Sequence, residues 1–271
     1  MEISLSPEIL FTIGSFPVTN SFFWSVILSL FLIGLTLLVR TRMKKIPGVL
    51  QNIVEMFLEG AYGFVQSVIG SEKKAKKVFP LVFTMFIFTL FANLATYIPG
   101  QAAVDIKTAG GVIPLFRAVM ADYSLVFMMT IISVLTTQII AIIVHGPFGY
   151  IGKFINLGGI KDLFKEILKG KFKPALLAQG FLDLFLGIMD VIGELAKVIS
   201  LSFRLFGNMF AGEVLSAVML FLFPFFAPLP FMFLGLLTAV VQAFVFSVLT
   251  LIFITMASEI EEDKLAEEAT I

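Results

Sequence analysis

Six ionisable side chains interrupt one long apolar stretch of the chain, residues 175–223. They are Asp183, Asp190, Glu194, Lys197, Arg204 and Glu213. Four of the six (Asp183, Asp190, Lys197 and Arg204) recur at seven-residue intervals. Seven residues turn an α-helix through about 700°, so successive members drift by only about 20°. We therefore expect one polar stripe along an otherwise apolar helix, and Asn208, four residues beyond Arg204, extends it.

Arg204 is the most costly of these side chains. A charge at the centre of a bilayer costs at least about 2.5 kcal/mol, and a guanidinium cannot escape that cost by losing its proton. Glu213 is not its simple partner, because nine residues place it about 180° around the helix and about 13 Å along it. Arg204 must therefore face a partner, a water-filled cavity or another subunit. Asp190 and Glu213 lie on opposite sides of it, at the graded depths that an ion path needs.

The composition is that of a polytopic membrane protein. The chain has 271 residues, of which 59% are hydrophobic and 14% charged, and its mean hydropathy is +1.03. Five apolar segments reach the roughly 20 residues that a membrane helix needs: residues 21–39, 79–98, 123–144, 175–223 and 231–257. The predicted fold is an all-α integral membrane protein, with a single membrane domain (1–271) that includes an external N-terminal segment (1–20) and an acidic cytoplasmic tail (258–271).

Two segments depart from a simple upright span. Residues 175–223 are about twice as long as a perpendicular helix needs, so this segment must be tilted, bent or partly outside the bilayer. Residues 49–69 carry small and apolar side chains at three- and four-residue steps, namely Ile53, Phe57, Gly60, Ala61, Phe64 and Val68. That period predicts an amphipathic helix that lies in the membrane interface or packs on other helices.

The basic residues predict an orientation. The chain has 19 lysines and arginines, and fifteen of them lie after the first and third spans or in the tail. Only Lys107 and Arg117 lie on the opposite side, while Lys197 and Arg204 lie inside the fourth span. Because cytoplasmic loops carry the excess of basic residues, we expect the N-terminus outside and the C-terminus in the cytoplasm.

Several classes of function are disfavoured. The chain has no cysteine and one histidine, His145, and it has no His-Glu-x-x-His or Gly-x-Ser-x-Gly motif. We therefore expect no metal, no cofactor and no catalytic residue. The net charge of zero gives no reason to expect nucleic acid as a partner.

A stand-alone secondary transporter or channel with an intramembrane charged site stays open as an alternative, although no internal repeat is apparent. A purely structural membrane anchor would not need the charged stripe.

The last span adds neutral polar groups. Thr238, Gln242 and Thr250 share one helical face, and Gln242 can both donate and accept hydrogen bonds. Gly207, Gly212 and Gly235 permit close approach between helices.

Residues 200–213, Ser-Leu-Ser-Phe-Arg-Leu-Phe-Gly-Asn-Met-Phe-Ala-Gly-Glu, closely resemble the signature of subunit a of rotary F-type ATP synthases. Residues 241–246 and 256–259 resemble the last helix of that family, residues 121–124 the start of its third span, and residues 80–99 its second. The resemblance covers nearly the whole chain from about residue 20.

The resemblance implies a non-catalytic stator subunit with two offset aqueous half-channels. These carry H⁺ or Na⁺ to and from the carboxylates of a rotating c-ring, and Arg204 separates them. Residues 200–213 and the last span would place Glu213, Asn208 and Gln242 at the outer half-channel. Asp190 matches an acidic position that the family associates with the cytoplasmic half-channel, to which we add Glu194 and Lys197. The implied partners are the c-ring, the peripheral-stalk subunit b, other ATP synthase subunits and the lipid bilayer. The implied location is the bacterial cytoplasmic membrane, and the two long C-terminal helices would pack, tilted, on the ring.

The sequence also departs from the family pattern. Gly235 stands where some relatives carry an ionisable partner for the Glu213 position, and Thr96 stands where others have an acid. Val198 stands where many relatives have proline. We therefore expect the outer half-channel to depend on Glu213, Asp122 and water.

Overall fold

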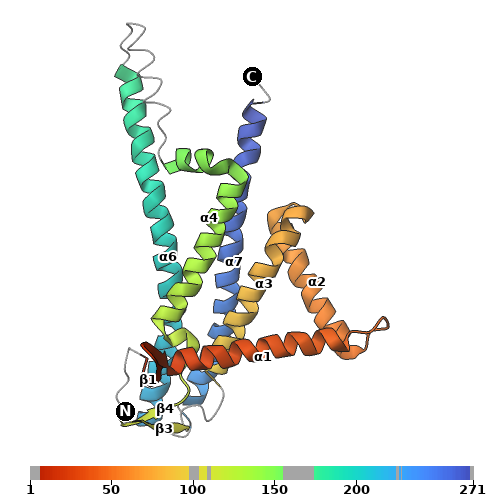
Figure 1. The fold of residues 1–271 in the computed structure, drawn as a ribbon, viewed down its shortest axis with the longest axis vertical. Helices are drawn as coiled ribbons and strands as arrows, with labels where there is room; N and C mark the ends of the chain where they lie inside the picture. The colour runs from red at the N-terminus through yellow and green to blue at the C-terminus, as the bar shows by residue number, and fades with distance from the viewer. Residues whose placement is uncertain are drawn as a thin grey trace. The chain divides into compact units, whose positions relative to one another are not determined.

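The computed structural model describes residues 7–97, 104–108, 111–154, 174–223, 226 and 228–268. Six long helices account for most of these residues (Figure 1). They are α1 (Asn20–Arg42), α2 (Val49–Ile69), α3 (Glu72–Ala95), α4 (Tyr123–Phe154), α6 (Pro174–Leu222) and α7 (Pro228–Glu268). Four of the described helices are long and apolar enough to cross a membrane: α1, α3, α4 over Tyr123–Ile143 and α7 over Pro228–Ala257. The fifth crossing, which we assigned to residues 175–223, stays a prediction.

The chain divides into two compact units. The first comprises residues 1–129 and 202–252, and the second comprises residues 130–201 and 253–271. Helices α4, α6 and α7 each contribute residues to both units. The single membrane domain that we expected stays a prediction, and each unit is described by itself.

Two short β-hairpins in the first unit were not predicted. Strands β1 (Ile9–Ile13) and β2 (Phe16–Thr19) pair antiparallel, and so do β3 (Asp105–Thr108) and β4 (Gly111–Pro114). Gly14 begins the two-residue loop of the first hairpin at φ 64°, which a residue with a side chain rarely adopts. The predicted all-α class is confirmed by the six helices, and the hairpins are small additions to it, one in the N-terminal segment and one in the connection before α4. Strands of four or five residues are too short to produce a clear alternating pattern.

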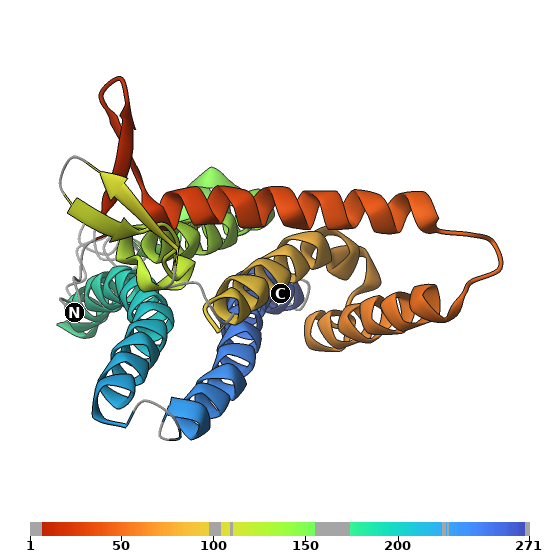
Figure 2. The same cartoon turned by 90° about the horizontal axis from the view of Figure 1, so that it is seen from below.

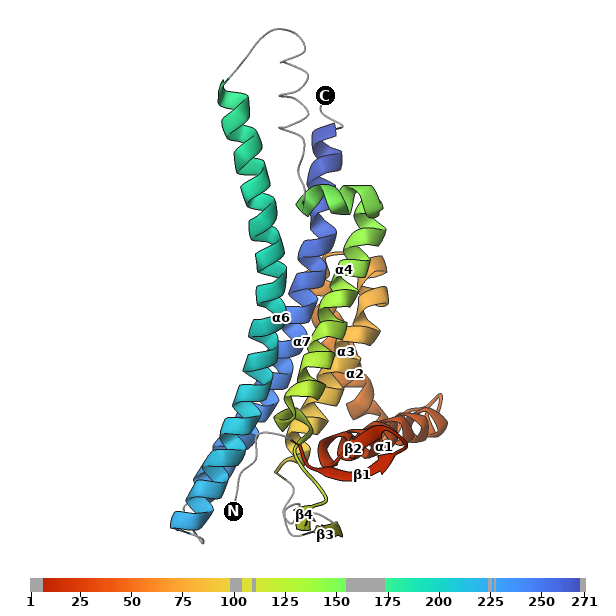
Figure 3. The same ribbon diagram turned by 60° about the vertical axis from the view of Figure 1, so that its left-hand side comes forward.

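The start of α1 and the connection after β4 form a buried cluster in the first unit. The short 3₁₀ turn η2 (Val119–Ala121) is fully packed against α1 and α3. Asn20 Nδ2 donates to the carbonyl oxygen of Pro114 at 3.3 Å, which ties the start of α1 to the end of β4. Figure 3 shows the β1–β2 hairpin at that end of α1.

Helices α2 and α3 form a helical hairpin closed by Gly70, which adopts φ 74° at the end of α2 (Figure 2). The bounds of α2 match the predicted residues 49–69, whereas α3 begins at Glu72, seven residues before the predicted residue 79. Its first turn carries Glu72 near the positive helix terminus and an ion pair from Glu72 to Lys76 of 2.8 Å. Both features stabilise a helix start, so residues 72–78, which precede the predicted span and include four lysines, are helical.

Helix α6 runs unbroken for 49 residues, or roughly 73 Å at 1.5 Å per residue. A bilayer core is about 30 Å thick, so the length supports the prediction that this helix does not cross upright. Helix α4 is kinked at Gly146, where φ is 72°. The kink lies close to the predicted end of the third span.

Candidate functional site: polar groups on α3, α6 and α7

One face of α6 packs inward in the first unit, and Arg204 lies outside that face. Leu205 and Met209 are buried four residues apart, and Glu213 continues the same row. Arg204 precedes Leu205 by one residue, which is about 100° of rotation, and it is exposed. Among the residues that the structure describes, none forms a hydrogen bond or ion pair with the Arg204 guanidinium. The guanidinium is therefore presented outward from this chain.

Glu213, by contrast, lies against protein. Its Oε2 atom is buried and has no hydrogen-bond partner in the described part of the chain. Arg117, in the segment just before η2, lies near enough for its charge to act on the Glu213 carboxylate. Arg117 is only 9% exposed. The sequence placed it, with Lys107, in an outer connection. The scarcity of basic residues on that side was the only signal that could have marked Arg117.

Other buried polar atoms on these helices also lack protein partners within the described ranges. They are Asn208 Nδ2 on α6, Gln242 Nε2 on α7, and Thr89 Oγ1 and Asn93 Oδ1 on α3. Asn93 does use its other end, because Nδ2 donates to the Ala239 carbonyl oxygen at 3.1 Å and so joins α3 to α7. A buried polar atom without a partner costs about 1–3 kcal/mol, and such atoms often contact water or an ion. Three of the predicted site residues, Asn208, Glu213 and Gln242, share this property.

Asp122 has a simpler structural role. It is 3% exposed, and its Oδ1 accepts a hydrogen bond from the Ser124 backbone nitrogen at 2.9 Å. Asp122 immediately precedes α4, so this contact caps the helix. Its predicted place in the outer half-channel stays a prediction.

Two of the predicted site residues in the second unit, Glu194 and Lys197, form an ion pair. Lys197 Nζ lies 2.9 Å from Glu194 Oε1 and 5.0 Å from the centre of the Phe253 ring. Gln138 on α4 donates from Nε2 to Glu194 Oε2 at 2.6 Å. Sequence reasoning missed Gln138, because a single glutamine in a predicted span carried no spacing signal. Asp190 is exposed, and the side chain of Asp183 lies outside the described residues.

A family model described as ATP synthase A chain matches residues 22–255. The chain belongs to this family. A Moorella thermoacetica protein named ATP synthase subunit a is 32% identical over 250 residues, which cover 92% of this chain and 94% of that protein. Proteins of the same name from Campylobacter curvus and Syntrophobacter fumaroxidans are 33% identical over 225 residues and 30% over 256 residues. Those alignments cover 83% and 94% of this chain and 84% and 91% of the respective relatives.

As a member of the ATP synthase A chain family, the protein is a non-catalytic, multi-pass membrane subunit of the ATP synthase complex. The family assignment also carries the ion-translocating role of a stator. The resemblance read from residues 200–213 is thereby confirmed.

The glycines that were expected to bring helices together behave differently from one another in this family member. A Cβ atom added at Gly207 would meet nothing within 4 Å, whereas Gly212 and Gly235 both lie beneath the side chain of Tyr97. At these two positions the approaching group is a tyrosine and not a helix backbone.

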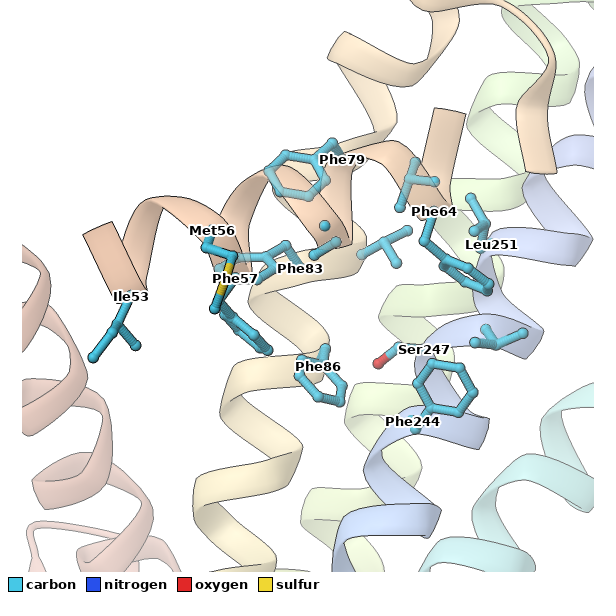
Figure 4. Close-up of a pocket in the computed structure, with 15 residues that line it drawn as sticks. Ile53, Met56, Phe57, Phe64, Phe79, Phe83, Phe86, Phe244, Ser247 and Leu251 are labelled. Carbon is cyan, nitrogen blue, oxygen red and sulfur yellow. The ribbon is translucent and has the colours of Figure 1, made fainter. Parts of the chain in front are cut away.

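One pocket of the first unit is apolar. A pocket of about 610 Å³ lies between α2, α3 and α7 (Figure 4). Five of the six α2 residues that the amphipathic pattern identified, all except Val68, line it. The prediction that α2 packs on other helices is confirmed, and its place in the membrane interface stays a prediction. Ser247, the only polar side chain in the lining, donates to the Ala243 carbonyl oxygen at 3.0 Å. This pocket therefore offers no route for an ion.

Proposed function

We propose that this chain provides two offset aqueous half-channels that carry H⁺ or Na⁺ to and from the carboxylates of a rotating c-ring, and that Arg204 separates them. The observation that carries the proposal is the outward, unengaged guanidinium of Arg204 on a helix whose neighbouring Leu205 is fully buried. A permanent charge cannot be left facing lipid at low cost. A carboxylate on another subunit compensates that charge.

The separation of the half-channels follows from the charge itself. A fixed positive charge attracts a passing carboxylate in its ionised form, so the carboxylate releases its ion beside Arg204. The same charge repels cations, so an ion cannot pass directly from one half-channel to the other. Arginine suits this role better than lysine because it keeps its proton when it is desolvated.

The outer half-channel is proposed to contain Glu213, Asn208, Gln242 and Asp122. The unpartnered buried atoms of Glu213, Asn208 and Gln242 support this assignment, since water molecules in a channel satisfy such atoms. Arg117 joins this group through its electrostatic contact with Glu213. The cytoplasmic half-channel is proposed to contain Asp190, Glu194 and Lys197, of which the exposed Asp190 is the most accessible.

The proposed setting is a bacterial cytoplasmic membrane with the N-terminus outside and the C-terminus in the cytoplasm. Helix α6 supplies the fifth crossing as a tilted helix that packs, together with α7, on the c-ring. The peripheral-stalk subunit b is proposed to contact the same chain elsewhere. The uneven distribution of basic residues supports this orientation.

The decisive experiment replaces Arg204 in the complete ATP synthase, reconstituted into vesicles. Arg204→Ala is expected to abolish ion-driven ATP synthesis and to increase passive ion leak, while Arg204→Lys retains a small part of the coupling. Arg42→Ala, at the end of α1, is the matched control and is expected to keep wild-type synthesis. Wild-type coupling in Arg204→Ala would overturn the proposal.

A further inference from the structure

Tyr97 follows α3 and places its phenol ring over glycines of two other helices in the first unit. A Cβ atom added at Gly235 on α7 would clash with the hydroxyl oxygen of Tyr97 and would lie 2.8 Å from both Cε1 and Cζ of the ring. A Cβ atom added at Gly212 on α6 would lie 3.3 Å from the Tyr97 hydroxyl oxygen. Real Cβ contacts are essentially never shorter than 3.0 Å. Glycine at position 235 is therefore required by the ring that covers it.

An apolar ring would fill this space equally well, so the hydroxyl group needs a separate explanation. A tyrosine hydroxyl in a protein interior usually finds a hydrogen-bond partner. Among the described residues none hydrogen-bonds to the hydroxyl group of Tyr97, whose side chain is half-buried. The hydroxyl oxygen lies over Gly235 and beside Gly212, and Gly212 immediately precedes Glu213, whose Oε2 is buried without a partner in the described part of the chain. The Tyr97 hydroxyl thus lies one residue along α6 from a carboxylate with unmet hydrogen-bonding capacity.

We propose that Tyr97 is a further positioning residue of the outer ion route: its hydroxyl group holds a water molecule beside the Glu213 carboxylate. A phenol hydroxyl can donate one hydrogen bond and accept others, so it orders water between the outer solution and Glu213 without changing its own charge. Gly212 and Gly235 are the structural requirement for this arrangement, because they leave the space that the ring occupies. The inference rests on the proposed ion-translocating function of Glu213.

The first test is Tyr97→Phe in the complete ATP synthase, because this change removes only the hydroxyl oxygen and keeps the ring over Gly235. We expect normal assembly and about three- to tenfold slower ion-driven ATP synthesis, as for the loss of one ordered hydrogen bond. This loss of rate is expected when ions enter from the outer side at limiting concentration. It is expected to become smaller when the ion concentration is saturating. Gly235→Ala, which pushes the ring aside, is expected to slow synthesis and also to lower assembly.

The second test uses the absence of cysteine from the chain. Tyr97→Cys creates a single thiol, which we expect to react with a membrane-impermeant thiol reagent applied from the outer side. Ala243→Cys, at a fully buried position of α7, is the matched control and is expected to stay unreactive. Labelling is measured on the assembled complex by mass spectrometry.

The outcomes separate this inference from the proposed function. Wild-type synthesis in Tyr97→Phe at limiting ion concentration, or an unreactive Tyr97→Cys variant in an assembled complex, would overturn the role of Tyr97. If Arg204→Ala uncouples the same complex, the proposed function still stands. If Arg204→Ala is fully coupled, the proposed function fails whatever Tyr97 does.

Discussion

In the unit formed by residues 1–129 and 202–252, Glu213 has a buried carboxylate oxygen without a protein partner. In the unit formed by residues 130–201 and 253–271, both carboxylate oxygens of Glu194 are engaged, one by Lys197 and the other by Gln138. The same chemical group on the same helix is therefore left incomplete in one unit and satisfied in the other.

This difference bears on function because satisfied and unsatisfied buried groups serve different ends. A paired carboxylate lowers its own burial cost and holds helices together. An unpaired one carries a cost that is retained only where water, an ion or a partner completes it. This difference supports our proposal that Glu213, Asn208 and Gln242 line an ion route, whereas Glu194 also holds α4 and α6 together through Gln138.

The largest difference in the rate of ATP synthesis is expected between variants of the two glutamates. Glu213→Gln is expected to slow ion-driven ATP synthesis by at least about tenfold, because an amide cannot bind and release the ion. Glu194→Gln is expected to slow it less and to lower stability by about 1 kcal/mol, since the ion pair with Lys197 is lost. The measurements are synthesis in vesicles and the midpoint of thermal unfolding of the complex. A greater loss of rate in Glu194→Gln than in Glu213→Gln would reverse the comparison.

A smaller effect is expected at Arg117. Arg117→Ala removes the positive charge that acts on Glu213, so the ionised carboxylate loses an attractive interaction, and synthesis is expected to slow by about three- to tenfold. Arg117→Lys is expected to restore part of the rate because it returns the charge. Equal rates in the two variants would show that charge at position 117 is irrelevant.

The smallest effect is expected at Gln242. Gln242→Met has a similar shape but lacks the unpartnered amide, so the complex is expected to gain about 1 kcal/mol of stability while synthesis slows by about two- to threefold. Ser247→Ala, on the apolar pocket side of α7, is the matched control and is expected to change neither quantity. Thermal unfolding and synthesis are again the measurements. A loss of stability in Gln242→Met would indicate that the amide is already satisfied.

Much of the helical framework could be predicted from sequence because its signals are local. The three- and four-residue apolar period of α2 predicted the bounds of that helix to the residue. The start of α3 was misplaced because a run of lysines is typical of a loop, and only the Glu72–Lys76 pair shows how that run stabilises a helix. The hairpins escaped prediction because two four- or five-residue strands have little pattern of their own.

The sequence by itself determined that this is a membrane protein of the ATP synthase A chain family with a costly arginine at position 204, since hydropathy and a continuous motif are read along the chain. Only the tertiary structure decided that Arg117 acts on Glu213, that Gln138 completes Glu194, and that Tyr97 covers Gly212 and Gly235. Such contacts join residues far apart in the chain. They depend on the rotation and register of packed helices, which the local helical period leaves open.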